Sequence, residues 1–216
     1  MPQSLYSEIG SLAPDILIAD GSVGFLLKGS TLKSGQGVLK RGSVLGIIKT
    51  AGVTVTAETN TGGGTCTGAA TGKNAKVGSY VLKCIAVALN AGTFSVIDPN
   101  GNRLADAVVG AAYLNEIGFT LNDAETDFAV GDSFTLAVAA GSGLAKLVDK
   151  AAADGSNIAD SILADDVDTT ADADAQVYTS GLFNRKALIF AANNTAADHE
   201  LRLREIGIFL KDNIAY

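Results

Sequence analysis

Short apolar runs separated by turn residues recur along the chain, and this pattern is typical of a β-rich protein. Residues 44–48 form a continuous apolar run, and residues 53–56 and 78–84 alternate strictly between two faces. Residues 25–27 predict another strand, which we expect to end at the Gly-Ser-Thr turn of residues 29–31. The pattern therefore predicts a mainly β fold with a few short helices.

The middle of the chain is rich in threonine and glycine and carries evenly spaced strand signals. Residues 93–97 are expected to pair with residues 105–109 across the Asn100-Gly101 turn, because both turn residues tolerate positive φ. Residues 117–121 and 133–138 complete the set. Strands at this spacing predict a small β-sandwich.

Composition changes on both sides of this block. The change falls at Ala51-Gly52 on one side, and the segment at residues 141–143 is expected to be a hinge on the other. The sequence therefore predicts an inserted domain, residues 52–141, within a discontinuous host domain made of residues 21–51 and 142–216.

Residues 1–20 are weakly patterned and are expected to form an N-terminal arm. Apolar side chains could share one helical face, but Pro14 stops a helix before it grows. Such an arm is either disordered or held by a bound partner, and the sequence leaves both open. The apolar residues of the arm are Leu5, Tyr6, Ile9, Leu12 and Ile16.

A short helix is predicted near the C-terminus. Residues 195–198 supply capping side chains for a helix over residues 199–204, and His199 is expected at its surface. Residues 206–210 return to a strand pattern.

Composition narrows the functional classes. The 216 residues are 47% hydrophobic and 18% charged, which indicates a folded protein, and the net charge of −7 argues against nucleic-acid binding. No apolar run is long enough to cross a bilayer, and residues 1–10 lack a signal-peptide pattern. We therefore expect no membrane partner and folding in a cytosol.

No catalytic set is apparent, and we expect no enzyme, cofactor or metal site. His199 is the single histidine, so no second imidazole is available for a catalytic pair. Asp98 and the acidic residues of 165–174 could ligate calcium, but they lack the EF-hand spacing and serve equally well in turns. Cys66 and Cys84 are either free thiols or a disulfide across paired strands.

Several motifs outside the middle block resemble one known family. Residues 40–48 resemble the "rGtvLG" strand of the lambda-type bacteriophage head decoration proteins, and residues 146–156 resemble their "yklydpaaaDGs" segment. Residues 162–168 are similar to "gILleDvda", and residues 206–210 to the terminal "lgI.lk". The motifs occur in the family's order and cover about half of the chain or more.

The resemblance implies a capsid decoration protein that binds the outer surface of the expanded phage head. Such proteins are compact, mostly β homotrimers at three-fold positions, and they stabilise the shell by bridging major capsid subunits. Residues 1–20 would be the capsid-binding arm. Residues 52–141 depart from the short family members and resemble the Ig-like inserts of longer phage structural proteins.

A second function remains open from the sequence. The threonine- and glycine-rich block also fits an Ig-like adhesin or binding module that recognises surface glycans. The basic pair Lys40-Arg41 is either a solvated turn or a contact for an acidic partner surface.

Overall fold

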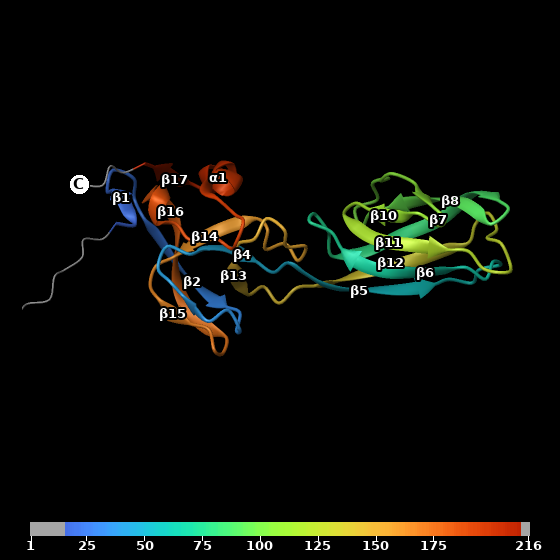
Figure 1. The fold of residues 1–216 in the computed structure, drawn as a ribbon, viewed down its shortest axis with the longest axis horizontal. Helices are drawn as coiled ribbons and strands as arrows, with labels where there is room; N and C mark the ends of the chain where they lie inside the picture. The colour runs from blue at the N-terminus through green and yellow to red at the C-terminus, as the bar shows by residue number, and fades with distance from the viewer. Residues whose placement is uncertain (1–15, 213–216) are drawn as a thin grey trace, which may run out of the picture.

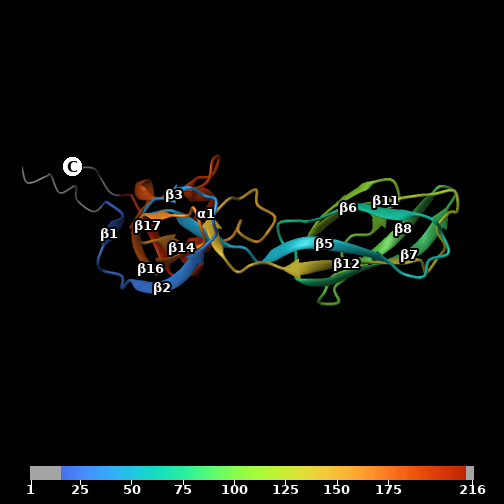
Figure 2. The same cartoon turned by 90° about the horizontal axis from the view of Figure 1, so that it is seen from below.

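The computed structural model describes residues 16–212, which form two lobes at opposite ends of an elongated molecule (Figure 1). The first lobe contains residues 16–49 and 142–212, and the second contains residues 50–141. The chain crosses between them twice, as the view from below also shows (Figure 2). Strands dominate both lobes, so the predicted mainly β class is confirmed.

Most strands of the first lobe belong to one seven-stranded sheet, whose pairings close part of it into a ring. The ring order is β16, β14, β4, β13 and β2, and β2 pairs back onto β16. The elements of this lobe are β1 (Ile18–Asp20), β2 (Leu26–Leu32), β3 (Val38–Leu39), β4 (Val44–Ile47), β13 (Ala145–Leu147), β14 (Ala159–Leu163), β15 (Val167–Asp168), β16 (Ala173–Asn184), the 3-10 helix η1 (Arg185–Ala187), α1 (Ala196–Glu205) and β17 (Ile208–Lys211).

The ring and the outer sheet each enclose a core, and β16 contributes to both. Val177 points into the ring beside Leu45 and Leu163, whereas Phe183 packs with Ile208 and other residues beneath α1. Beyond the ring, β16 lies between β1 and β17. Strand β4 packs tightly against the loop that precedes β14. A Cβ on Gly46 would lie 2.2 Å from the Ser156 carbonyl oxygen, so only glycine fits there.

Strand β2 is longer than the sequence indicated. The predicted turn at residues 29–31 is wrong, because these residues continue the strand and pair with residues 174–176 of β16. Ser30 and Thr31 are polar and half-buried, but they lie on a strand whose backbone bonds are supplied by a distant partner. Tertiary pairing overrides the local turn propensity here.

The second lobe consists of a five-stranded sheet and a three-stranded sheet around one core. The first sheet has the order β5-β12-β7-β8-β9 and the second β10-β11-β6. Their bounds are β5 (Thr50–Ala57), β6 (Thr65–Thr71), β7 (Gly78–Ala88), β8 (Ala91–Ile97), β9 (Ala107–Val108), β10 (Ala112–Leu114), β11 (Ile117–Asn122) and β12 (Ser133–Ala140). The predicted pairing of residues 93–97 with 105–109 is confirmed by β8 and β9.

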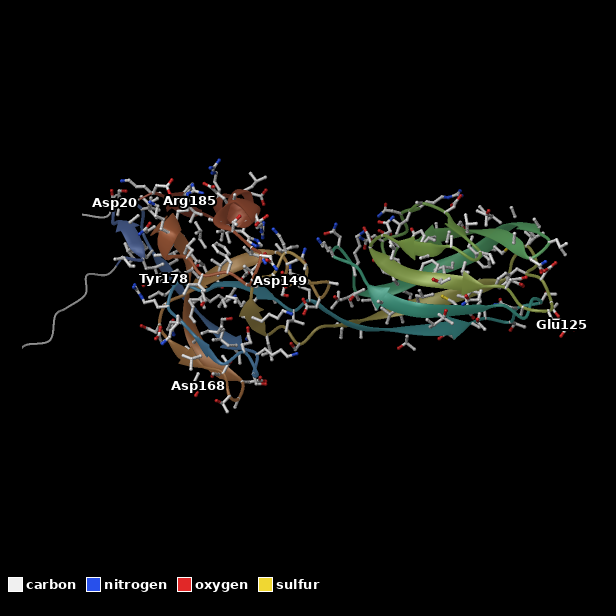
Figure 3. All side chains as sticks on the ribbon, in the orientation of Figure 1. Asp20, Glu125, Asp149, Asp168, Tyr178 and Arg185 are labelled. Carbon is white, nitrogen blue, oxygen red and sulfur yellow. The ribbon has the colours of Figure 1, made fainter. Side chains whose placement is uncertain are left out.

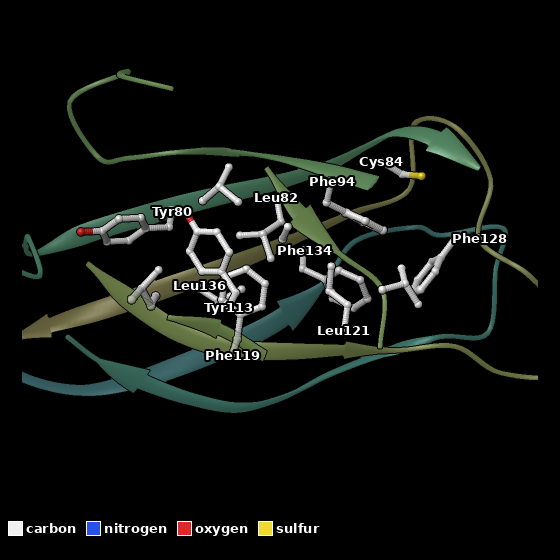
Figure 4. Packing of buried hydrophobic residues seen from close by; sticks show 14 of the residues in the cluster. Tyr80, Leu82, Cys84, Phe94, Tyr113, Phe119, Leu121, Phe128, Phe134 and Leu136 are labelled. Atoms are coloured by element: carbon white, nitrogen blue, oxygen red, sulfur yellow. The ribbon is translucent and has the colours of Figure 1, made fainter. Parts of the chain in front are cut away.

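Aromatic residues fill the core between these two sheets (Figure 4). Phe94 lies edge-on to Phe128 with ring centroids 5.0 Å apart, and Tyr113 stacks on Phe119 at 4.7 Å. Cys84 is buried and Cys66 partly buried, and both are free thiols, so the disulfide alternative is excluded. Burial raises the pKa of Cys66 to about 11, which disfavours its reactive thiolate.

Carboxylate side chains hold the loops at both ends of the second lobe. At one end Lys76 Nζ lies 2.6 Å from Asp98 Oδ2 and 2.8 Å from Glu116 Oε1, and the Tyr80 hydroxyl donates to Glu116. At the other end Asp132 accepts backbone N–H bonds from Thr61, Gly62 and Ala129. The glycine-rich turn at residues 61–64 is therefore held in place by Asp132.

The two chain crossings are bonded to each other and to a loop of the first lobe. Gly141 N donates to Lys49 O and Gly143 N to Ile48 O, while Lys49 N and Thr50 N both donate to Asp154 O. A Cβ on Gly141 would lie 2.6 Å from Ile48 O. The segment at residues 141–143 is thus a braced crossing, not the hinge that its glycines suggested.

Helix α1 extends beyond the prediction and buries the residue expected at its surface. Thr195 and Asp198 form a capping box, as the sequence indicated. His199 is only 3% exposed, stacks on Phe190 at 5.4 Å and lies 3.0 Å from Asn194 Oδ1. Because His199 and the buried Leu203 are four residues apart, they share the face that packs on the sheet.

We predict that Phe94→Ala lowers the free energy of unfolding of the second lobe by about 3–5 kcal/mol, because it leaves a cavity beside Phe128 and Phe134. Val81→Ala is the control, since Val81 is exposed on the outer face and its truncation costs about 0.5 kcal/mol or less. Hydrogen exchange of second-lobe amides measures both. Equal losses in the two variants would contradict the core assignment.

We predict that Asp132 gives the second lobe a pH-dependent stability. Burial alone raises the pKa of Asp132, but the three N–H donors outweigh it and hold the pKa below the usual value of 3.8. The carboxylate therefore stabilises the fold above about pH 4, and this contribution is lost as the pH falls through the lowered pKa. Asp132→Asn should be less stable at neutral pH and show a smaller further loss on acidification, followed by thermal unfolding.

Candidate functional site

The best candidate for a functional surface is the end of the first lobe at which the N-terminal segment enters the fold. Ile16 is 64% exposed, whereas Leu17 is buried in the core beneath α1. Asn184 fixes this entry: its side-chain Nδ2 donates to Ile16 O at 3.0 Å, and its backbone N donates to Leu17 O. The chain is therefore anchored from residue 16 onward.

The described end of the C-terminal segment is held at the same place. Strand β17 runs parallel to β16 on the side opposite β1, and Lys211 Nζ lies 3.9 Å from Asp20 Oδ2. Arg185 lies between Glu200 and Asp212, with Nε 3.3 Å from Asp212 Oδ1. Its guanidinium holds the pKa of Glu200 below the usual range. Both chain segments consequently reach one end of the first lobe.

Exposed apolar side chains surround this entry point. Phe209 is 41% exposed and pairs with Leu182 of β16, and Leu26 is 64% exposed and pairs with Ser180 of the same strand. We group the exposed apolar residues Ile16, Leu26 and Phe209 as the entry surface, and the last two lie on strands paired with β16. Exposed apolar side chains next to a chain entry can serve as a contact surface.

This surface lies at the end of the molecule farthest from the tip of the second lobe. Figure 3 places Asp20 and Arg185 near one extremity and Glu125 at the other. A partner bound at the entry point would therefore leave the second lobe directed away from it.

The acidic residues between β14 and β16 are used in local structure. Asp166 accepts from Lys40 Nζ at 2.7 Å and from Arg41 N, and Asp172 accepts from Ser34 N. Asp98 accepts from the N–H groups of Asn100 and Asn102 within its turn. Across residues 16–212 no group of three His, Cys, Asp or Glu side chains is arranged to hold a metal ion.

The predicted arm residues fall on both sides of the described boundary. Leu5, Tyr6, Ile9 and Leu12 lie outside the described residues, and Ile16 stands at the entry point. The last part of the 1–20 range belongs to the fold, since Ile18–Asp20 forms β1 against β16.

The sequence did not single out Leu26 and Phe209, which are exposed beside the entry, or Asn184, which is buried and holds it. The sequence held no signal for them, because their exposure depends on strand pairings between distant segments.

No helix in the described part of the chain has the length and apolar character needed to cross a membrane.

Comparisons with known proteins define the family. The family model of bacteriophage lambda head decoration protein D matches residues 7–208, nearly the whole chain. No curated protein matches. Two crystal structures of Xanthomonas campestris FlgL align with TM-scores of 0.33 and 0.32 at 23% and 22% identity. Each alignment covers 45% of this chain and 32% of the FlgL chain. TM-scores this low support no inference about fold or function.

The chain belongs to the bacteriophage lambda head decoration protein D family. This confirms the family that its motifs resembled. The family is a structural one of the phage capsid, not an enzyme family, and membership associates the protein with the phage head.

We predict that Asn184→Ala loosens the chain entry by removing the side-chain bond to Ile16 O, at a cost of about 1 kcal/mol. Amides of residues 17–20 should exchange faster while those of the ring remain protected. Gln176→Ala, at an exposed position of the same strand, is the control. Unchanged exchange at residues 17–20 would show that Asn184 does not anchor the entry.

Proposed function

We propose that the protein is a cementing protein that binds the outer surface of the expanded phage head and bridges neighbouring major capsid subunits as a homotrimer. Family membership supports a role on the capsid. The observation that favours this arrangement is the placement of the chain entry and its apolar surroundings opposite the second lobe.

In this proposal the N-terminal segment is the main attachment. Residues 1–15 carry Leu5, Tyr6, Ile9 and Leu12, and backbone groups of such a segment can extend a sheet of the capsid subunit. Three such segments on one trimer gain avidity, so no single contact has to be strong. Ile16, Leu26 and Phe209 would contact the shell around the point where each segment leaves the fold.

We further propose that the first lobe is a decoration domain interrupted by the second. The first lobe's sheet is assembled from residues 18–47 and 145–211, whereas the second lobe uses a continuous stretch. The ends of that stretch meet, since Thr50 pairs with Ala140. Adjacent ends are what insertion of a domain into a loop requires. An Ig-like ancestry of this lobe remains a prediction.

The test is a truncation that respects the boundary in the structure. Removal of residues 2–15 is expected to abolish co-sedimentation with expanded capsids but to leave the fold and the solution mass of a trimer unchanged. Removal of residues 2–20 should in addition destabilise the first lobe, because it deletes Leu17 from the core and β1 from the sheet.

Normal capsid binding by the 2–15 truncation would overturn the role of the N-terminal segment. A monomeric mass for the intact protein at concentrations that saturate capsids would overturn bridging by a trimer. Phe209→Ser, with the N-terminal segment intact, separates the contribution of the surrounding apolar surface.

A further inference from the structure

We propose that Lys76 and Asp98 become joined by an intramolecular amide bond, with Glu116 as the acid–base group that forms it. The three side chains come from separate loops at one end of the second lobe. Lys76 lies between β6 and β7, Asp98 follows β8, and Glu116 lies between β10 and β11. Because Lys76 precedes the β7–β8 hairpin and Asp98 follows it, the bond closes the open end of this hairpin into a covalent ring.

The amine and the carboxyl group are already in contact. Lys76 Nζ lies 2.6 Å from Asp98 Oδ2. The lysine is also held by its backbone, whose N–H donates to the Tyr80 hydroxyl at 2.9 Å. The Asp98 side chain is fully buried. Two reactants that the fold holds in contact have already lost most of the entropy that their encounter would cost.

Glu116 is placed to transfer protons at the reacting nitrogen. Its Oε1 lies 2.8 Å from Lys76 Nζ, and its Oε2 lies 3.0 Å from the same atom. The Tyr80 hydroxyl donates to Oε2 and fixes the orientation of the carboxylate. A carboxylate in this position can accept a proton from the nitrogen and pass it to the leaving oxygen.

The two oxygens of Asp98 have partners that match different roles. Oδ1 accepts the backbone N–H groups of Asn100 at 2.9 Å and Asn102 at 2.7 Å. These two donors stabilise the negative charge that develops on Oδ1 when the nitrogen attacks the carboxyl carbon. Oδ2 accepts from Lys76 Nζ and from Asn102 Nδ2, so Oδ2 is the oxygen that leaves.

The reaction needs no reagent beyond these side chains. One proton passes directly from Lys76 Nζ to Asp98 Oδ2, which gives a neutral amine and a neutral carboxyl group. The nitrogen lone pair then forms the Nζ–Cγ bond. Glu116 takes a second proton from the nitrogen and delivers it to Oδ2, and the Cγ–Oδ2 bonding pair leaves with that oxygen as water. Glu116 ends as it began, and one positive and one negative charge are lost.

The unreacted state is an ion pair, and this limits the rate. Hydrogen bonds to Asp98 and then to Glu116 raise the pKa of Lys76, and the bonds from Lys76 and Asn102 lower the pKa of Asp98. The neutral pair that reacts is therefore a minor state. The bond accumulates slowly in the folded protein, which keeps the three groups together while it forms.

The test is the intact mass of the full chain under denaturing conditions, measured after purification and after prolonged incubation at neutral pH. The mass should fall below that of the sequence by one water molecule. Digestion should then yield a branched peptide that joins the segments around Lys76 and Asp98. A chain that keeps the full sequence mass after incubation, with the two segments recovered as separate peptides, overturns the bond and leaves an ion pair only.

Substitutions separate the three roles, with hydrogen exchange of second-lobe amides to verify each fold. Lys76→Arg keeps the charge but should retain the full mass, whereas Lys83→Arg, at an exposed lysine on β7, should still lose water. Glu116→Gln should slow the reaction by about 100-fold or more. Asp98→Asn should reach the same branched product by losing ammonia. Loss of water by Lys76→Arg overturns the site, and an unchanged rate in Glu116→Gln overturns the role of Glu116.

Discussion

The first lobe depends on β16, a single strand that serves two cores. Its first half closes the ring against β2 and β14, and its second half carries β1 and β17. The change between these roles occurs at Gly181, whose φ of 142° is open to glycine alone and where a Cβ would lie 2.5 Å from Phe25 Cδ1. The ring, the helix layer and the chain entry are thereby positioned by one strand.

A second constraint is the bonded crossing between the lobes. The Asp154 carbonyl accepts from both Lys49 and Thr50, while the Asp154 side chain pairs with Lys146 and accepts from Ser156. The loop that resembles the family segment "aaaDGs" thus braces the strands that lead to the second lobe. These bonds join the two lobes where the chain crosses between them, and the chain entry lies at the other end of the first lobe.

Several acidic side chains form hydrogen bonds and ion pairs that hold loops and turns in place. Asp98 holds a turn and pairs with Lys76, Asp132 ties the loops at the far tip, and Asp166 anchors Lys40 and the Arg41 backbone. Lys76 donates hydrogen bonds to Asp98 and Glu116, and these bonds raise the pKa of its ammonium group. The acidic residues whose net charge argued against nucleic-acid binding therefore also stabilise the loops that connect the strands.

The sequence by itself determined the mainly β class, most strands, the helix cap and the family, because these depend on local alternation, turn chemistry and short motifs. It missed β6, whose small residues Thr65–Thr71 become a strand only through pairing with β11, and it placed a turn inside β2. It also placed His199 at the surface, since the helical pattern does not reveal which face packs on a sheet. The chain entry at Asn184, the exposed Phe209 and the meeting of Lys76 with Asp98 and Glu116 were decided by tertiary structure, because each arises where segments distant in sequence come together.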